Sequence, residues 1–596
     1  MTALDYIVIA LYFLGLIGVS LVVSRRIRNS EDMFIAGRNS SWWLSGVSSY
    51  MTIFSASTFV VWGGVAYKSG LVATTVAWCF CIASIIVARW ISGKWRSLRI
   101  KSPGEFLTIR FGHRTVSFYT IAGIIGRGIH TAVALYAVSV VMCAVINVPC
   151  DSFLASTGAF GDSPEGHLSI WWALAILGTI TLVYTIAGGF LAVLMTDVIQ
   201  FGVLFSVVLF LVPLSFHEVG GVGVFMEKAS SIPGFFSGFS QTYTPLWMIL
   251  WVFLQVACVG GDWPFVQRYI SVPTVKDARK STYLIALLYL ITPLIWYIPA
   301  MIYRVLVPGP GMDADPAMMT RIGESAYVNM SKTVLMSGMV GMMLAAMLSA
   351  TMSNFSGNLN VYANVFTYEI WGHREKNRGA DEKTRIKVGR LFTLFFGLAI
   401  IVVSMLIPFA GGAEKTVVTI LTMVICPLYI PSIWGLFSRR LTGNQLIYAM
   451  LATWVVGFSA KFAIPASVLT PTIIESLSGC VLPVLILACM ELWSSRHGLT
   501  SPGYETVQTY TDPHADMEPD ERMRKATRKF SHLAVSCFCI TIGAVALLLI
   551  GLILAGDPKT LAVKGIVLSF VAGILAFIAG YVTYRLVDAK KESKSV

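Results

Sequence analysis

The chain contains fifteen apolar runs, each close in length to a segment that crosses a lipid bilayer. About 20 consecutive apolar residues span the hydrocarbon core as a helix. Backbone groups inside that core must pair within the segment, and a helix achieves this. The sequence therefore predicts an all-α polytopic membrane protein with about 15 transmembrane helices. The runs cover residues 6–24, 41–67, 71–92, 116–147, 169–187, 190–215, 245–261, 282–305, 333–369, 390–410, 414–437, 444–464, 472–494, 533–555 and 564–587.

Lys and Arg residues gather in alternate loops between these runs. Basic clusters follow the first, third, seventh, ninth, eleventh and thirteenth runs, whereas loops 148–168, 216–244 and 306–332 contain few. Short cytoplasmic loops are enriched in Lys and Arg. We therefore expect a multi-pass protein of the cell (plasma) membrane, with its N-terminus outside and its C-terminus in the cytoplasm. The net charge of +13 fits loops that face anionic lipid, and it does not indicate nucleic-acid binding.

The composition argues against an enzyme. Hydrophobic residues make up 56% of the chain and charged residues 13%, which leaves too little polar surface for a soluble protein of this size. The longest polar stretch, 495–532, is too short for a catalytic domain, and no nucleophile–base pair is visible. The ten cysteines show no metal-ligand spacing. We expect no enzyme activity and no cofactor, and no obligate protein partner is evident.

One apolar run carries hydroxyl groups in its middle, from Ala345 to Asn354. At helical spacing Ala346, Ser349 and Ser353 lie on one face, so a backbone carbonyl and two hydroxyls can point to the same place. Such neutral oxygens suit a bare alkali cation. Helix packing is the alternative interpretation, because Ala, Ser and Thr are common where membrane helices meet.

Several runs contain residues that interrupt a helix. Irregular backbone at membrane depth is tolerated where it lines a cavity, and interrupted helices in matching positions of two halves indicate a transporter binding site. The interruptions are the polar centre Ser48–Phe59 with Gly63 and Gly64 in the second run, Gly260 and Gly261 in the seventh, and Pro427 and Pro431 in the eleventh.

The order of the runs predicts a transport core with extra helices at both ends. Runs two to six and seven to eleven would form two five-helix units of opposite topology, since five is odd. The expected parts are an N-terminal extra helix with a cytoplasmic loop (1–40), the inverted-repeat core (41–440, with repeats 41–215 and 245–440), and C-terminal accessory helices (441–596, with a cytoplasmic segment at 495–532).

Groups of residues occur in an order and at separations typical of one transporter family. They are Gly37-Arg38 and Trp42-Trp43 before Ser55-Ala56, Gly188 to Val193 leading to Thr196 to Gln200, Val266 to Tyr269, and Ala346 to Ser353. Over about residues 5–495 the chain thus resembles the sodium:solute symporter family, which includes sodium–glucose, sodium–proline and sodium–sialic acid transporters. The resemblance implies the five-plus-five inverted-repeat fold of the bacterial leucine transporter.

The resemblance also implies a main sodium site between the second and ninth runs. Many relatives supply a hydroxyl at the position of Ala350, so coordination here would be one oxygen short unless Thr351 or a water substitutes. The remaining ligands match the carbonyls of Met51, Phe54 and Ala346 and the hydroxyl of Ser349.

A second sodium site, present in some relatives, would use Asp197 with hydroxyls at positions that match Ser349, Met352 and Ser353. Met352 has no hydroxyl, so one ligand is missing here too. Asp197 is notable by itself, because an acid within an apolar span is expensive and usually functional. A salt bridge or a solvated position is the alternative for this residue, and the number of sodium ions, one or two, stays open.

Arg127 lies within an apolar run, with His130 one turn along on the same face. An arginine at membrane depth needs an anion or several carbonyls, and sialic-acid relatives use an arginine on this helix for the substrate carboxylate. We predict that Arg127 faces the cavity and selects a carboxylate. Snorkelling of the side chain to the cytoplasmic surface is the alternative interpretation.

Other polar side chains near helix centres are candidates for binding the solute, although each could equally hold helices together. A galactose site of the type in galactose-transporting relatives is not expected, because Ala77 stands where those relatives carry the sugar-binding acid. The candidates are Ser55, Thr58, Gln255 and Thr419.

These expectations favour a sodium-coupled symporter that takes up a small polar organic solute, such as a sugar, a sialic-acid-like compound or another carboxylate, by alternating access. Sodium is the expected coupling ion. One alternative is a proton-coupled carrier of the same fold, in which Asp197 or His130 titrates. Another is a sensor that binds the solute without transporting it, an interpretation that Ala350 keeps open.

Overall fold

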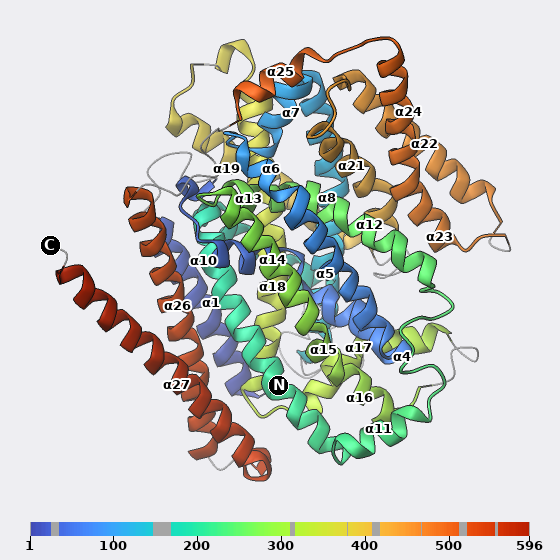
Figure 1. The fold of residues 1–596 in the computed structure, drawn as a ribbon. Coiled ribbons are helices and arrows are strands. Elements are labelled where there is room, and N and C mark those ends of the chain that lie inside the picture. The colour runs from blue at the N-terminus through green and yellow to red at the C-terminus, as the bar shows by residue number, and fades with distance from the viewer. Residues whose placement is uncertain are drawn as a thin grey trace.

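The structure is a computed structural model, and it describes residues 2–24, 35–146, 168–309, 316–377, 379–407, 418–465, 468–511, 521–554 and 558–594. These residues are mainly helical, and the β contact among them is an isolated bridge between Leu98 and Thr511. Within these described ranges, eleven helices are long and apolar enough to cross a membrane, or up to 13 when each of two bent pairs counts as one span. The all-α membrane fold is therefore confirmed (Figure 1).

The first half of the chain runs from α1 to the long helix α10. Helix α7 starts at Pro103, because the Ser102 side chain accepts a hydrogen bond from the Glu105 amide at 3.0 Å and proline suits the first helical position. The elements are α1 (Ala3–Ser24), η1 (Ala36–Arg38), α3 (Trp42–Ile53), η2 (Thr58–Trp62), α4 (Gly63–Ser69), α5 (Val72–Trp90), α6 (Ser92–Ser97), α7 (Pro103–Phe111), α8 (His113–Val145), α10 (Ile170–Val219) and α11 (Val222–Ser230).

The second half begins with α12, whose start is fixed by Thr244: its side chain accepts from the Trp247 amide at 3.2 Å. The elements are α12 (Pro245–Gly261), α13 (Trp263–Ile270), α14 (Val275–Ile291), α15 (Pro293–Trp296), α16 (Ile298–Leu306), α17 (Pro316–Val334), α18 (Met339–Val365), η3 (Phe366–Trp371), η4 (Glu375–Asn377), α19 (Glu382–Leu406), η6 (Ile420–Ile425), α21 (Cys426–Gly435), α22 (Gly443–Ala463), α23 (Pro471–Ser476), η7 (Leu477–Val481), α24 (Leu482–Arg496), α25 (Pro502–Thr509), α26 (Glu521–Leu554) and α27 (Pro558–Lys594).

The expected count of fifteen spans is not confirmed. Runs 169–187 and 190–215 form one continuous element, α10, with 50 residues, because the glycine pair between them does not end the helix. Its apolar part before the glycines is only Ile170–Val183, and the eleventh run survives as the short apolar helix Ile420–Gly435. Both are shorter than a full span. Residues 408–417, which hold the start of that eleventh run, lie outside the described part of the chain.

Two helices are broken where the sequence predicts interruptions. Helix α3 ends at Ile53, Phe54 is extended, and the chain bends by 65° into the segment Thr58–Ser69. Helix α12 ends at Gly261, Asp262 is extended, and the bend into α13 is 51°. The two breaks occupy corresponding positions in the two expected repeats, although the repeat boundaries themselves stay a prediction.

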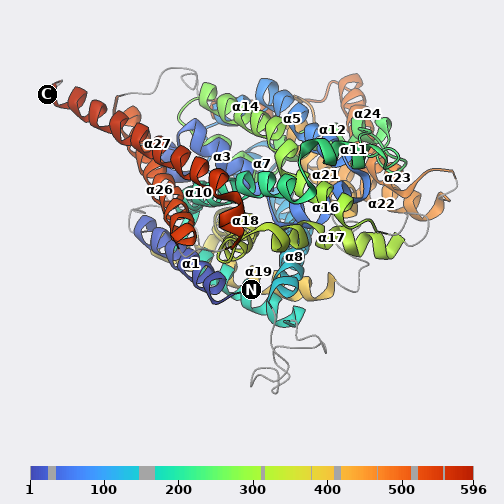
Figure 2. The ribbon, with the colours of Figure 1, turned by 90° about the horizontal axis from the view of Figure 1, so that it is seen from below.

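Helix α18 occupies the centre of the molecule, and 94% of its most apolar 18-residue stretch is buried. Helices α26 and α27 lie on one side with α1, and α22 to α24 lie on the opposite side (Figures 1 and 2). Both breaks are therefore enclosed by helices, which places their irregular backbone away from lipid.

Candidate functional site

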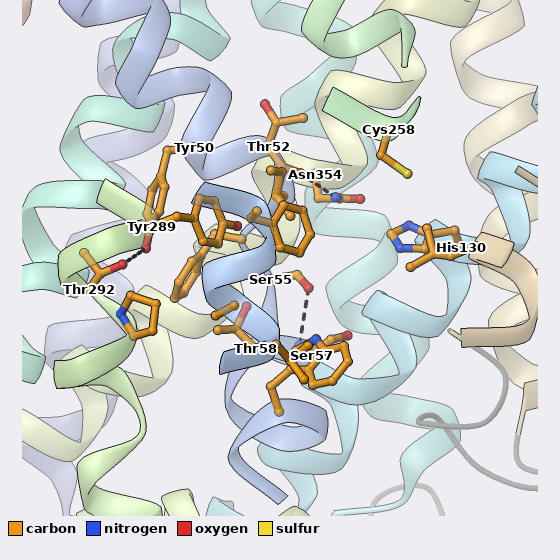
Figure 3. A pocket seen from close by; sticks show the side chains of 18 of the residues that line it. Tyr50, Thr52, Ser55, Ser57, Thr58, His130, Cys258, Tyr289, Thr292 and Asn354 are labelled. Atoms are coloured by element: carbon orange, nitrogen blue, oxygen red, sulfur yellow. Dashed lines mark hydrogen bonds between the residues drawn. The ribbon is translucent and has the colours of Figure 1, made fainter. Parts of the chain in front are cut away.

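A cavity of about 100 Å³ lies beside both breaks (Figure 3). A space of this size holds several water molecules or a small solute. Its polar lining includes Ser55, Ser57 and Thr58 from the first broken helix and Asn354 and Asn358 from α18. Aromatic rings form much of the remaining wall, namely Tyr50, Phe54, Trp62, Phe80, Trp251, Phe265, Tyr289, Trp296 and Tyr297.

Helix α18 bonds directly across the break in α3. The Thr351 hydroxyl accepts a hydrogen bond from the Ala56 amide at 3.0 Å, and the Asn354 side-chain amide donates to the Thr52 carbonyl at 2.6 Å. A break leaves backbone groups without helical partners, and buried backbone groups need partners. The polar segment that the sequence singled out therefore satisfies the broken helix, and it does so with neutral groups.

Ser349 lies on the same segment of α18. Its side chain is fully buried, and its hydroxyl has no hydrogen-bond partner among the residues that the structure describes. Leaving a buried hydroxyl unpaired costs about 1–3 kcal/mol. Met51, Phe54 and Ala346, whose carbonyl oxygens are the other predicted sodium ligands, are buried as well. All of these oxygens therefore lie on residues that are shielded from water, as a dehydrated cation requires.

Asp197, on α10, is fully buried and forms an ion pair with Arg268 of α13, with 3.3 Å between Asp197 Oδ2 and Arg268 Nη2. Its two oxygens also accept from the hydroxyls of Ser48 and Ser353. Arg268 Nε in turn donates to the Ser48 hydroxyl at 2.8 Å. The structure thus brings Asp197 and Ser353 together, as the sequence suggests, but it adds a guanidinium to them. The salt-bridge interpretation is the arrangement found.

Arg127 lines the cavity with His130, and its charge is already paired. The guanidinium forms an ion pair with Asp262, the residue at the break between α12 and α13. Tyr429 of α21 bridges the two side chains. Its hydroxyl accepts a hydrogen bond from Arg127 Nε at 2.7 Å and donates one to Asp262 Oδ1 at 2.6 Å. Asp262 does not cap α13 with its side chain. Three elements are therefore tied together at the second break.

The other predicted solute-binding residues divide into two groups. Ser55 and Thr58 line the cavity. Gln255 is buried on α12 but is absent from the lining, and its side-chain nitrogen has no partner among the described residues. Thr419 lies elsewhere, where its hydroxyl donates to Glu475 Oε1 at 2.9 Å. Glu475 is paired with Lys461 at 2.7 Å, so Thr419 belongs to a contact with the accessory helices.

Sequence reasoning missed three residues that the structure places at the cavity. Asp262 follows the recognised Gly260-Gly261 pair directly, so an acid at a predicted break was a visible signal. Asn354 stood within the recognised polar segment. Asn358, one turn beyond it, donates to the Thr131 hydroxyl at 3.0 Å, and its carbonyl oxygen has no partner among the described residues.

The broken helices, the cavity beside them and the buried polar groups on a central helix define a membrane transporter of the interrupted-helix class. The sequence profile of the sodium:solute symporter family matches residues 33–455. The chain belongs to the sodium:solute symporter family, and it is a sodium-coupled solute transporter of many apolar helices.

Named relatives are similar over most of their length. The chain is 26% identical over 497 residues to a sodium/glucose cotransporter from Vibrio parahaemolyticus, covering 77% of this chain and 85% of the relative. It is 25% identical to the sodium/sialic acid symporter NanT from Aliivibrio fischeri, with 76% and 86% covered. For the sodium/myo-inositol cotransporter 2 of Sus scrofa the identity is 26%, with 73% and 66% covered.

Solved structures share the fold at low identity. A Na⁺-coupled sialic acid symporter in a substrate-bound outward-open state superposes with a TM-score of 0.63 and 18% identity, covering 81% of this chain and 98% of that one. The nucleobase-cation-symport-1 family transporter Mhp1, in a closed conformation, superposes with a TM-score of 0.50 and 15% identity, covering 81% and 99%. The architecture is therefore that of transporters with the fold of the bacterial leucine transporter.

Proposed function

We propose that the protein takes up a small polar organic solute together with sodium, and that sodium binds between the break in α3 and helix α18. The proposed ligands are the carbonyls of Met51, Phe54 and Ala346 and the hydroxyl of Ser349. The observation that carries the proposal is the Ser349 hydroxyl, which is buried and without a partner among the described residues. It lies on the helix that bonds across the break.

A second, weaker sodium site is proposed at Asp197 and Ser353. Their direct contact supports it, because a carboxylate with a neighbouring hydroxyl is a hard-oxygen site. A cation here competes with the guanidinium of Arg268, which already neutralises the carboxylate. Occupancy of this site would therefore require Arg268 to shift, so we expect the Ser349 site to dominate the sodium dependence.

The solute would bind in the cavity beside both breaks, where Ser55, Thr58 and Arg127 supply polar groups. Relatives named for glucose, myo-inositol and sialic acid support a polyhydroxylated solute. Gln255 is proposed as a supporting residue behind the lining. Thr419 is proposed to act indirectly, since it contacts the accessory helices instead of the cavity.

Transport would proceed by alternating access. Bound sodium would join α3 to α18 and so favour the solute-binding conformation, and its loss on the other side would release the solute. Sodium shifts the equilibrium between the two conformations only by its differential affinity for them.

We also propose that the N-terminus faces the outside and the C-terminus the cytoplasm. Labelling of single introduced cysteines on intact cells tests this orientation.

The test is uptake into proteoliposomes over a sodium titration, after a thermal-shift screen with sugars, sialic acids, amino acids and short carboxylates, each in sodium and in potassium, has identified a solute. We expect Ser349→Ala to abolish sodium-stimulated uptake with a modest effect on expression. The matched control is Ser404→Ala, which removes a buried hydroxyl that bonds its own helix α19.

Each outcome of this test discriminates between functions. An unchanged sodium half-saturation in Ser349→Ala would make this hydroxyl ordinary helix packing. Uptake driven by a proton gradient without sodium would favour the proton-coupled carrier. Binding of a solute without uptake in either gradient would favour a sensor.

A further inference from the structure

The first turn of α18 receives a carboxylate from a different helix. Asp5 of α1 accepts hydrogen bonds at Oδ1 from the amides of Gly338, at 2.7 Å, and Gly341, at 2.8 Å. The first amides of a helix have no partner within it. Helix α18 cannot cap itself, because its N-cap is Gly338, which has no side chain and a φ of 85°. Asp5 therefore supplies the cap from α1.

The contact is close and fully occupied. Asp5 is 2% exposed, and its second oxygen accepts from the Thr2 amide at 2.8 Å and the Thr2 hydroxyl at 2.9 Å. A Cβ on Gly341 would lie 2.6 Å from the Asp5 Cα and closer still to its carbonyl oxygen. Only glycine at position 341 allows the two helices to approach this closely.

The same helix carries the proposed sodium ligands a short distance further on. Ser349 follows Gly341 by eight residues, which corresponds to about 12 Å along a helix. Helix α18 is almost entirely buried, so its first turns have little freedom to rearrange independently. A negative charge at a helix N-terminus also stabilises the first turn, because it offsets the positive end of the helix dipole there.

We propose that Asp5 is a positioning residue for the sodium site, because it holds the first turn of α18 in place and so fixes the helix that carries Ser349. This inference rests on the proposed function, in which Ser349 binds sodium. It gives α1, which lies outside the two expected repeats, a role in coupling: α1 packs against both α18 and α10, the helix that carries Asp197.

The test compares three proteins in sodium-dependent uptake and in sodium-dependent thermal stabilisation. Asp5→Ala removes the cap and the charge, and we expect the sodium half-saturation to rise about 3- to 10-fold, the range that corresponds to the loss of one helix N-cap. Asp5→Asn keeps an acceptor oxygen but removes the charge, so a smaller rise is expected. The control is Asp381→Asn, which weakens a side-chain cap of α19 that accepts from the Thr384 amide at 3.3 Å; its sodium half-saturation should not change.

A merely structural role would give a different pattern. In that case Asp5→Ala would lower the unfolding temperature and the amount of protein, but the sodium half-saturation would stay that of the wild type, and the proposal would be overturned. With the proposed role, the solute half-saturation at saturating sodium changes by less than about twofold while the sodium half-saturation rises. If Asp5→Ala is not recovered from the membrane, the nearly isosteric Asp5→Asn carries the same test.

Gly341→Ala provides an independent variant, since it pushes α1 away while leaving the Asp5 charge in the chain. We expect it to raise the sodium half-saturation as well. The proposed function and the role of Asp5 are tested separately. A wild-type protein whose uptake ignores sodium contradicts the proposed function. Sodium-dependent wild-type uptake with unchanged half-saturation in Asp5→Asn and Gly341→Ala contradicts only the role of Asp5.

Discussion

The breaks that end α3 and α12 have nearly the same backbone conformation but different hydrogen-bonding and charged groups. Phe54 (φ −71°, ψ 129°) and Asp262 (φ −68°, ψ 128°) are both extended. The first break is bridged by a hydroxyl and an amide of α18, whereas the second carries a carboxylate paired with Arg127. The neutral break leaves the oxygens that the proposed sodium ion would use. At the charged break, the carboxylate of Asp262 is already paired with Arg127.

This difference suggests a division of labour. In the proposed function the break in α3 would change its hydrogen-bond partners on sodium binding, because neutral hydrogen bonds are individually modest, about 0.5–1.5 kcal/mol each. The break at Asp262 joins α12 and α13 to α8 and, through Tyr429, to α21. The ion pair and the shared tyrosine hydroxyl therefore resist the separation of these helices.

The largest effect is expected when one partner of this ion pair is removed. Asp262→Asn or Arg127→Gln alone leaves a buried unpaired charge, which costs about 3–5 kcal/mol of unfolding free energy. The double variant Arg127→Gln/Asp262→Asn should recover much of this loss, since it leaves no charge. Thermal unfolding of the purified single and double variants measures the difference.

The same variants decide whether Arg127 selects a carboxylate. Because Arg127 is paired with Asp262, we expect Arg127→Gln to lower the stability as well as any binding of carboxylates. If Arg127→Gln keeps wild-type stability and weakens only the binding of carboxylates, Arg127 is a solute ligand and the contrast between the two breaks does not hold. If every solute that binds is uncharged, the carboxylate prediction is wrong.

A smaller effect is expected at the neutral break. Asn354→Ala removes the donor to the Thr52 carbonyl and leaves that buried acceptor unpaired, which costs about 1–3 kcal/mol. We also expect a higher sodium half-saturation, because the break loses one of its ties to α18. Ser215→Ala is the control, since its hydroxyl bonds only the Leu211 carbonyl within α10 at 2.9 Å. Equal effects of both variants would show that Asn354 is ordinary packing.

The smallest effect should come from adding an oxygen to the proposed sodium site. Ala350→Ser supplies the hydroxyl that the family resemblance implies at this position. We expect the sodium half-saturation to fall about threefold, equivalent to roughly 0.6 kcal/mol, which is comparable with one modest polar contact. Ala363→Ser adds a hydroxyl to the same helix about 20 Å further along and should leave the sodium half-saturation unchanged. A tighter sodium dependence in both variants would indicate a general effect on the helix.

The sequence predicted the features of the two breaks that depend on neighbouring residues. Both breaks lie where polar or glycine-rich centres interrupt apolar runs, and the hydroxyls of α18 were recognised from their spacing. The partners across the fold were not readable, because Arg127 and Asp262 are 135 residues apart and nothing local links them. The glycine pair at 188–189 misled the count of spans, since an isolated glycine pair costs a helix only about 2 kcal/mol and packing overrides it.

The contact of Asp5 with α18 also has a consequence for biosynthesis. Gly338 and Gly341 follow Asp5 by 333 and 336 residues, and at roughly 5–20 residues per second the ribosome needs about 17–70 s to make them. During that time Asp5 lacks these two donors, and the hydrogen bonds from Thr2 are the ones that its own helix offers. Helix α1 can therefore make this contact only after the residues up to Gly341 have been synthesised, which ties its final position to a helix made much later.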